Sequence, residues 1–178
     1  METIQIKEKR FKTFIEEKEI LAQVKRVAQE INHDLAGKNP LFLCVLNGSF
    51  MFAADLAKEL TLPCEFSFVK LSSYVKDASS GTVKELIGVG SNVEGRTVVI
   101  VEDIVESGIT MQHMLETLKE KKVKEVRVAT LLTKPDKLEV DLKLDYVAME
   151  IPNDFIVGYG LDYDGYGRNY RDIYTVVE

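Results

Sequence analysis

A short stretch near the middle of the chain concentrates side chains that could do chemistry. It contains three acidic residues, a glycine and two hydroxyl residues within nine positions: Glu102, Asp103, Glu106, Ser107, Gly108 and Thr110. The backbone N–H groups and hydroxyls of the last three could surround an anion at the start of a helix. The carboxylates would repel that anion unless sugar hydroxyls or a hydrated Mg²⁺ lay between them. Acids that merely stabilise a helix N-terminus are the alternative, which accounts for one acid better than for the whole set.

The elements around this stretch alternate between apolar runs of strand length and amphipathic helices. Strands are expected at 41–46, 64–71, 97–101, 126–132 and 146–151, and helices at 17–36, at 52–60 and from just after 110 to about 121. Continuous β-branched runs between such helices are typical of a mainly parallel sheet covered on both faces. The sequence therefore predicts an α/β fold.

The C-terminal part has a different composition. It is rich in Gly, Tyr and Asp and has short strand signals at 155–157 and 173–177. We expect it to form a small flap, over about 151–178 together with the N-terminal segment, on a core of about 15–150 within one domain. Three of its tyrosines, Tyr159, Tyr163 and Tyr166, are expected to pack this flap.

Polar residues follow three of the predicted strands. They are Asn47-Gly48-Ser49, the stretch 102–110, and Thr133-Lys134. In open α/β sheets, ligands bind beyond the carboxyl ends of the strands. Because these segments would meet at one edge of the sheet, that edge is the predicted site.

Composition and charge narrow the kinds of partner. The chain has 178 residues and a formal net charge of −6, which argues against nucleic acid or an anionic membrane as the main partner. It has no apolar run near the ~18 residues that span a bilayer, and no secretion-signal pattern at its start. Cys44 and Cys64 lie within apolar runs, as buried small hydrophobes do. These features predict a cytoplasmic protein.

The stretch 102–110 closely resembles the phosphoribosyl-diphosphate-binding motif of the type I phosphoribosyltransferases. Further segments resemble the hypoxanthine/guanine branch of that family: 46–52 (LNGSFMF), 72–74 (SSY), 131–134 (LLTK) and 155–168 (FIVGYGLDYDGYGR). The resemblance runs in order from about residue 5 to 173. It implies a purine-salvage transferase that moves the phosphoribosyl group to a 6-oxopurine, giving IMP or GMP and diphosphate. It also implies a homodimer or homotetramer.

The resemblance assigns the phosphoribosyl diphosphate site residue by residue. Glu102 and Asp103 would meet the ribose hydroxyls, directly or through Mg²⁺. The 5′-phosphate and diphosphate would be bound by Asn47, Gly48, Ser107, Gly108, Ile109, Thr110 and Arg168. Ser73 and Tyr74, in the polar stretch that resembles the family's mobile lid, would also bind the phosphoribosyl diphosphate. Asp162 would hold a second Mg²⁺.

The resemblance likewise assigns the purine site. Glu106 would accept the proton of purine N7, and Lys134 would donate to the exocyclic O6, which selects oxopurines. Phe155 would stack on the base, and the backbone of Ile156 would meet its edge.

Three positions depart from the family pattern. Glu106 stands where aspartate is usual, so its carboxylate reaches one methylene further. Asn47 replaces a lysine or arginine, at a position that typically follows a non-proline cis peptide. Ile109 occupies a place often held by a polar residue.

Two other classes of protein could share parts of this pattern. A signalling receiver domain also ends a strand in adjacent acids, but it needs an aspartate where this chain has Thr133-Lys134. A nucleotide-sensing or RNA-binding regulator could use the same fold without turnover. The acidic balance and the lack of a basic stripe argue against RNA binding.

Overall fold

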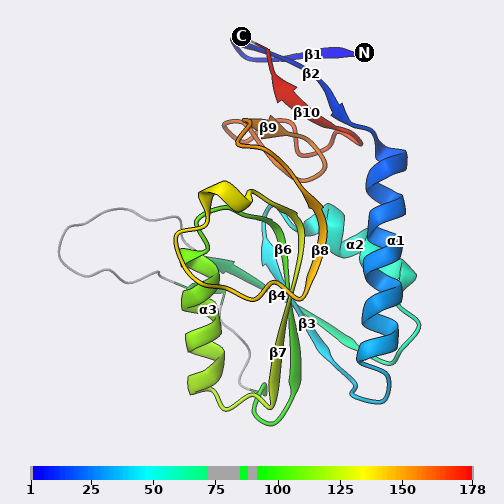
Figure 1. Cartoon of the computed structure of the whole chain (residues 1–178), viewed down its shortest axis with the longest axis vertical. Helices are drawn as coiled ribbons and strands as arrows, with labels where there is room; N and C mark the ends of the chain where they lie inside the picture. The colour runs from blue at the N-terminus through cyan, green and yellow to red at the C-terminus, as the bar shows by residue number, and fades with distance from the viewer. Residues whose placement is uncertain (1, 72–84, 88–91, 178) are drawn as a thin grey trace, which may run out of the picture.

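A computed structural model describes residues 2–71, 85–87 and 92–177 of the chain. Its central sheet has the strand order β5-β4-β3-β6-β7-β8 (Figure 1). These strands are β3 (Leu41–Leu46), β4 (Glu65–Leu71), β5 (Glu85–Ile87), β6 (Thr97–Val105), β7 (Glu125–Thr133) and β8 (Tyr146–Glu150). Neighbouring strands in the order β4-β3-β6-β7-β8 pair in parallel, and the edge strand β5 pairs antiparallel with β4. The predicted α/β fold with a mainly parallel sheet is confirmed.

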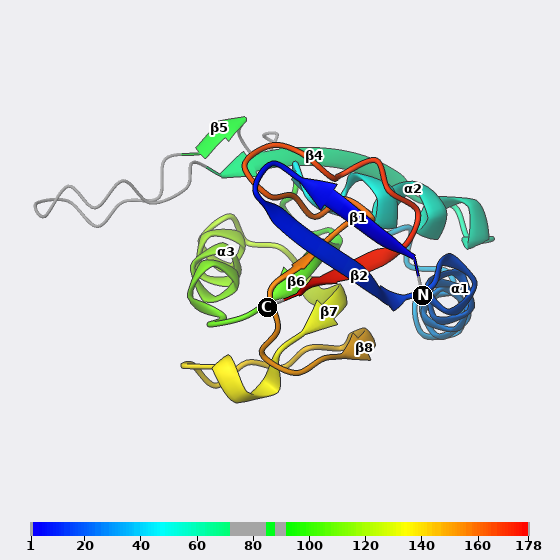
Figure 2. The same cartoon turned by 90° about the horizontal axis from the view of Figure 1, so that it is seen from above.

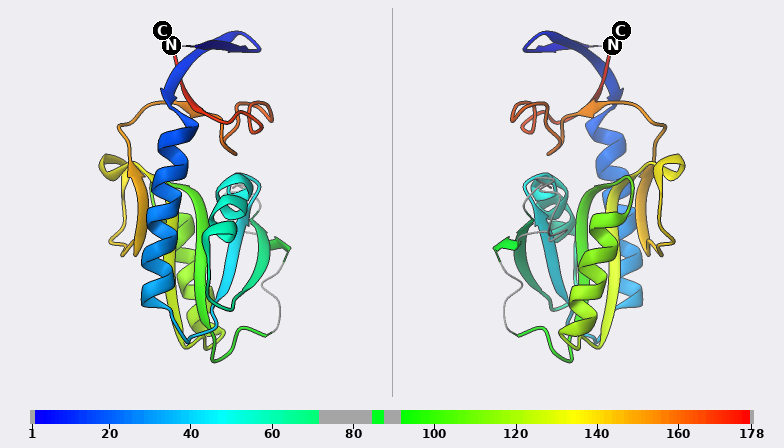
Figure 3. Two further views of the ribbon diagram at one scale, coloured as in Figure 1. Left: turned by 90° about the vertical axis from the view of Figure 1, so that its right-hand side faces the viewer. Right: turned by 90° about the vertical axis from the view of Figure 1, so that its left-hand side faces the viewer.

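Helices cover the two faces of this sheet. The helices α1 (Glu17–Asp34) and α2 (Phe50–Glu59) pack on one face, and α3 (Ile109–Glu120) packs on the other (Figure 3). The alternation of side chains along the strands divides the core accordingly, since Phe42 and Cys44 face α1 and α2 while Leu43 faces α3. A short 3₁₀ turn, Pro135–Lys137, follows β7.

A second, antiparallel sheet lies beyond the carboxyl end of the central sheet (Figure 1). Its order is β1-β2-β10-β9, with β1 (Thr3–Ile6), β2 (Lys9–Ile15), β9 (Ile156–Val157) and β10 (Ile173–Val176). The N-terminal strand β2 and the C-terminal strand β10 therefore lie side by side, as the view from above shows (Figure 2). The two N-terminal strands were not predicted, because their ladder is completed by β10 from the other end of the chain.

The strand that carries the acidic residues is longer than predicted. The sequence suggested that it ends at 101, but β6 continues to Val105. The ladder with β7 extends through Ile104 and Val105, so Glu102 and Asp103 belong to the strand and their backbone is fixed by it.

The sequence also predicted buried cysteines and no apolar run long enough to span a bilayer. Cys44 is buried and Cys64 is half-buried, and both thiols are free. Within the described residues, none of the helices has the length and apolar character needed to cross a membrane.

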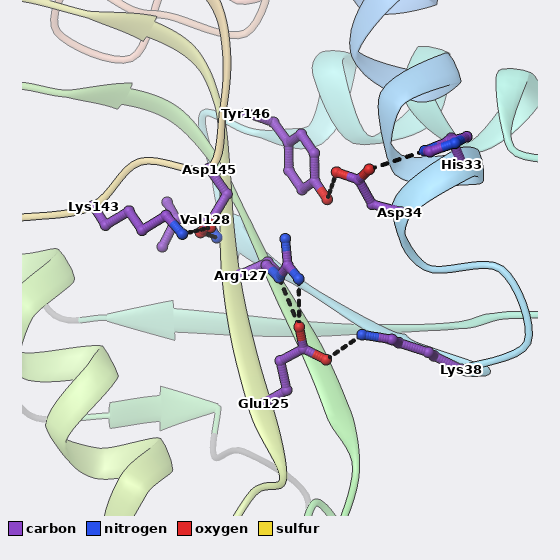
Figure 4. Close-up of polar contacts among 9 residues, drawn as sticks. All are labelled: His33, Asp34, Lys38, Glu125, Arg127, Val128, Lys143, Asp145 and Tyr146. Atoms are coloured by element: carbon purple, nitrogen blue, oxygen red, sulfur yellow. Dashed lines mark hydrogen bonds and ion pairs between the residues drawn. The ribbon is translucent and has the colours of Figure 1, made fainter.

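Polar contacts join the opposite end of the sheet to the end of α1 and to the loop that follows it (Figure 4). Glu125, at the start of β7, binds Lys38 at 2.9 Å and Arg127 at 2.6 Å. The hydroxyl of Tyr146, at the start of β8, donates to Asp34 at 2.9 Å. The Tyr146–Asp34 bond joins β8 to the end of α1, and the Lys38–Glu125 pair joins the loop after α1 to β7, at the end of the sheet opposite to the carboxyl edge.

Candidate functional site

Two adjacent carboxylates on β6 form the floor of the candidate site. Glu102 and Asp103 are both half-buried, and each accepts a hydrogen bond from the backbone N–H of the next residue, at 3.2 and 2.8 Å. Burial, and next the nearby charge of Asp103, raise the pKa of Glu102 well above its ordinary value. The electrostatics of this pair therefore favour a cation or sugar hydroxyls against it.

The carboxylates fit the way in which proteins bind Mg²⁺. Among residues 2–71, 85–87 and 92–177, no group of three or more acidic, His or Cys side chains forms a complete metal cage. Mg²⁺ usually takes one or two carboxylates and completes its shell with water and substrate oxygens. Glu102 and Asp103 supply that number of protein ligands.

The loop after β6 leads into the N-terminus of α3. Gly108 has a left-handed φ of 81°, which strains any other residue, and a Cβ there would lie 2.6 Å from Leu142 Cδ1. The Ser107 hydroxyl accepts from the N–H of Ile109 at 3.3 Å, and the Ser107 carbonyl accepts from Glu139 N at 2.9 Å. The loop is thus pinned in a turn at the positive end of a helix dipole.

This loop and the floor enclose a pocket of about 230 Å³. Its lining consists of Glu102, Ile104, Val105, Glu106, Ser107, Gly108, Thr110 and Met111. Thr110, in this lining, is exposed, and so is its neighbour Ile109. An anion can therefore reach the helix N-terminus with the carboxylates beside it.

An ion pair joins the ends of β6 and β7. The ammonium Nζ of Lys134 lies 2.5 Å from Oε1 of Glu106, with the lysine side chain 6 % exposed and the glutamate 42 % exposed. Hydrogen bonds between the two strand ends hold these residues side by side, because Lys134 N and the Thr133 hydroxyl each donate to the carbonyl of Val105 at 3.2 Å. A buried donor and an accessible acceptor therefore stand side by side at the carboxyl edge.

The loop between β3 and α2 approaches the same floor from the other side. The peptide Leu46–Asn47 is cis, as expected for this position. A Cβ on Gly48 would lie 1.7 Å from Oδ2 of Asp103, so the glycine backbone packs directly on that carboxylate. A Cβ on Gly160, in the flap, would in turn lie 2.1 Å from the carbonyl oxygen of Gly48.

The flap residues predicted to bind diphosphate and a second metal ion contact each other. Arg168 Nη2 lies 2.9 Å from Oδ1 of Asp162, and Arg168 Nη1 donates to the carbonyl of Gly160 at 2.7 Å. Asp162 thus lies with Arg168, and it does not join Glu102 and Asp103 in a carboxylate cluster within the described part of the chain.

The residues predicted to bind the purine come from both sheets. Phe155 is 45 % exposed and packs edge-on against Tyr163, with ring centroids 5.7 Å apart, whereas Ile156 is buried in β9. Tyr159 is buried as expected, but Tyr166 is 60 % exposed, so its predicted packing in the flap is wrong.

Sequence reasoning missed one close approach and could not place the lid. Gly160 was not singled out, although a glycine inside a Gly/Tyr-rich loop is a signal of close backbone contact. The predicted lid residues Ser73 and Tyr74 lie outside the described residues.

Comparisons with known proteins all find similarity to phosphoribosyltransferases. The sequence matches the family described as "Phosphoribosyl transferase domain" over residues 13–164. It is 42 % identical over 159 residues to the hypoxanthine-guanine phosphoribosyltransferase of Streptococcus thermophilus, covering 89 % of this chain and 88 % of that one. It is 41 % identical to that of Streptococcus mutans, covering 91 % and 89 %.

Solved structures give the same result. The crystal structure of a hypoxanthine-guanine phosphoribosyltransferase from Bacillus anthracis, with a HEPES molecule in its active site, has a TM-score of 0.88 and 38 % identity. It covers 93 % of this chain and 98 % of that one. A hypoxanthine phosphoribosyltransferase from Staphylococcus aureus has a TM-score of 0.88 and 34 % identity, covering 93 % and 91 %.

Proposed function

The chain belongs to the phosphoribosyl transferase family, and we propose that it is a purine-salvage enzyme that acts on hypoxanthine and guanine. It transfers the 5-phosphoribosyl group of phosphoribosyl diphosphate to the 6-oxopurine and releases diphosphate. The relatives in Streptococcus and Bacillus, similar over most of their length, support this reaction.

The Lys134–Glu106 pair is the observation that carries the choice of substrate. The O6 and N7 atoms of a 6-oxopurine are neighbours on one edge of the base. An ammonium donor 2.5 Å from a carboxylate acceptor matches an edge that offers an acceptor at O6 and a proton at N7. Lys134 donates to O6, and Glu106 accepts the N7 proton as the base attacks the sugar.

The floor carboxylates act on the sugar. Positive charge develops at the reacting sugar carbon as diphosphate leaves, and the fixed carboxylates of Glu102 and Asp103 stabilise that charge. Their backbone is held in the β6 ladder, so they need not reorganise during the reaction.

Mg²⁺ is the cofactor that these donors suit. Glu102 and Asp103 would hold one ion with the substrate, and Asp162 a second. When bound, Mg²⁺ neutralises charge on the departing diphosphate.

The remaining assignments follow the family pattern. The 5′-phosphate binds the loop of Ser107, Gly108, Ile109 and Thr110 at the start of α3, and diphosphate binds Asn47, Gly48 and Arg168. Phe155 stacks on the purine with its exposed ring surface, and the backbone of Ile156 meets its edge. Ser73 and Tyr74, which lie outside the described residues, are assigned to phosphoribosyl diphosphate binding by the family resemblance alone.

We also infer that both sheets act as one catalytic domain, because Gly160 of the flap packs on Gly48 of the core. The family resemblance supports a homodimer or homotetramer located in the cytoplasm.

The test is diphosphate release with phosphoribosyl diphosphate and Mg²⁺, with hypoxanthine, guanine, xanthine, adenine and uracil assayed in parallel. Turnover with oxopurines but not with adenine or uracil is expected. Silence with every base from folded protein would overturn the proposal in favour of a regulator without turnover. The role of Glu106 is tested by Glu106→Gln, for which unchanged turnover would refute proton acceptance.

A further inference from the structure

A buried tyrosine connects the flap to helix α2. Tyr159 is 1 % exposed, and its hydroxyl donates to Oδ2 of Asp55 at 2.5 Å. Burial, and next the hydrogen bond to Asp55, raise the pKa of Tyr159 well above its ordinary value, so the hydroxyl remains a donor at neutral pH. The flap loop lies over the start of α2 in both side and top views (Figures 2 and 3).

The residue after Tyr159 makes the closest contact between flap and core. Gly160 has a φ of 96° and packs on the carbonyl of Gly48, which itself packs on the carboxylate of Asp103. A displacement of the Tyr159 backbone therefore moves Gly160 off Gly48. Gly48 is therefore packed between Gly160 of the flap and the Asp103 carboxylate on β6.

The same loop carries the charged residues of the flap. Gly160 N donates to the carbonyl of Arg168 at 2.9 Å, and Arg168 Nη1 returns a bond to the carbonyl of Gly160 at 2.7 Å. Arg168 also pairs with Asp162 at 2.9 Å. These bonds make the turn from Tyr159 to Arg168 a unit, so one anchor positions all of it.

Asp55 belongs to the helix that continues from the Asn47–Gly48 loop. It lies on α2, which starts at Phe50, and it also pairs with Lys58 at 2.7 Å. The Lys58 side chain is 72 % exposed, so that second bond is a surface contact of little energetic weight. The Tyr159 hydroxyl, by contrast, is buried.

We propose that the Tyr159–Asp55 hydrogen bond is a positioning contact for the diphosphate half of the substrate site. It holds the flap turn that bears Asp162 and Arg168 against Gly48, so that the flap and core contributions to diphosphate binding stay aligned. Tyr159 and Asp55 act through these neighbours and touch no substrate themselves. This inference rests on the proposed function.

The test compares Tyr159→Phe, Asp55→Ala, the double variant and Asp55→Asn. Tyr159→Phe and Asp55→Ala should each raise the KM for phosphoribosyl diphosphate by about tenfold, the weight of a hydrogen bond to a charged group. The KM for hypoxanthine should change less than twofold. The KM of the double variant for phosphoribosyl diphosphate should be no higher than that of either single variant, because the two substitutions remove the same hydrogen bond. Asp55→Asn keeps an acceptor for the hydroxyl and should restore most of the affinity.

Lys58→Ala is the matched control, since it removes the other partner of Asp55 without touching Tyr159. Its KM values should equal those of the wild type. Calorimetric titration with inorganic diphosphate and Mg²⁺ gives a second readout that needs no turnover. Wild-type protein that binds diphosphate but turns over no base would contradict the proposed function. The diphosphate affinities of the variants would still test the positioning contact.

Two results would overturn the inference. One is Tyr159→Phe with a lowered Tm but unchanged affinity for both phosphoribosyl diphosphate and diphosphate, which would make the bond purely structural. The other is an equal rise in both substrate KM values, which would indicate a general loosening of the flap.

Discussion

Removing the carboxylate of Glu106 should leave the ammonium of Lys134 buried without the carboxylate that pairs with it. Breaking a fully buried ion pair costs about 3–5 kcal/mol, whereas an exposed pair is worth about 0–1 kcal/mol. Here the lysine side chain is 6 % exposed and the glutamate 42 %. We therefore expect Glu106→Ala to lower the free energy of unfolding by about 2 kcal/mol. For a chain of this size the Tm should fall by about 4–8 °C.

Urea unfolding at neutral pH measures this loss, and a second substitution isolates its cause. Lys134→Met keeps most of the side-chain length and removes the charge. Adding it to Glu106→Ala should recover more than half of the lost free energy, because no buried ammonium is then left unpaired. The kcat of Glu106→Ala should also fall by about 10²-fold, since the acceptor for the purine proton is gone. Measuring both properties on one preparation separates lost chemistry from lost fold.

Either of two outcomes would refute this reasoning. A Glu106→Ala variant that unfolds within about 0.5 kcal/mol of the wild type would show that the ion pair carries little energy. A double variant no more stable than Glu106→Ala would show that the unpaired ammonium is not the source of the loss.

Three further predictions concern specificity, steric fit and pH. Lys134→Ala should lower the preference for hypoxanthine over adenine at least tenfold in kcat/KM, and equal loss for every base would contradict its role at O6. Gly48→Ala places a Cβ 1.7 Å from Asp103 Oδ2, so the KM for phosphoribosyl diphosphate should rise more than tenfold in protein whose urea midpoint shows it folded. The hydrogen bond from Lys38, opposed by burial and aided by Arg127, holds the pKa of Glu125 below its ordinary value. Its stabilisation is therefore present above the unfolded value of about 4.3 and is lost as pH falls through the folded pKa. Glu125→Gln should flatten unfolding free energy against pH in that acid range, and an unchanged slope would count against it.

Local pattern was enough to predict most of the central layers. The spacing of Ile20, Val24, Val27 and Ile31 predicted α1, and each of these residues is buried in the structure. Continuous apolar runs predicted β3, β4, β6, β7 and β8 within a few residues, because side-chain periodicity is set along a single segment. The types and order of residues 102–110 were likewise sufficient to indicate an anion site beside carboxylates.

Features that depend on distant segments were not predictable in the same way. The strands β1 and β2 have weak local patterns and are completed by β10, from the opposite end of the chain. The extension of β6 through its acidic residues depends on an equally long β7 beside it. In both cases a ladder partner, and not the local sequence, decided the element.

The sequence by itself determined which chemical groups this protein brings to its site, whereas the tertiary structure decided how they meet. Glu106 and Lys134 are 28 residues apart, and their 2.5 Å contact follows from the parallel register of β6 and β7. The stacking of Gly160 on Gly48 requires the flap to fold back on the core. Such distances follow from packing between separate elements, which no periodicity within one segment encodes.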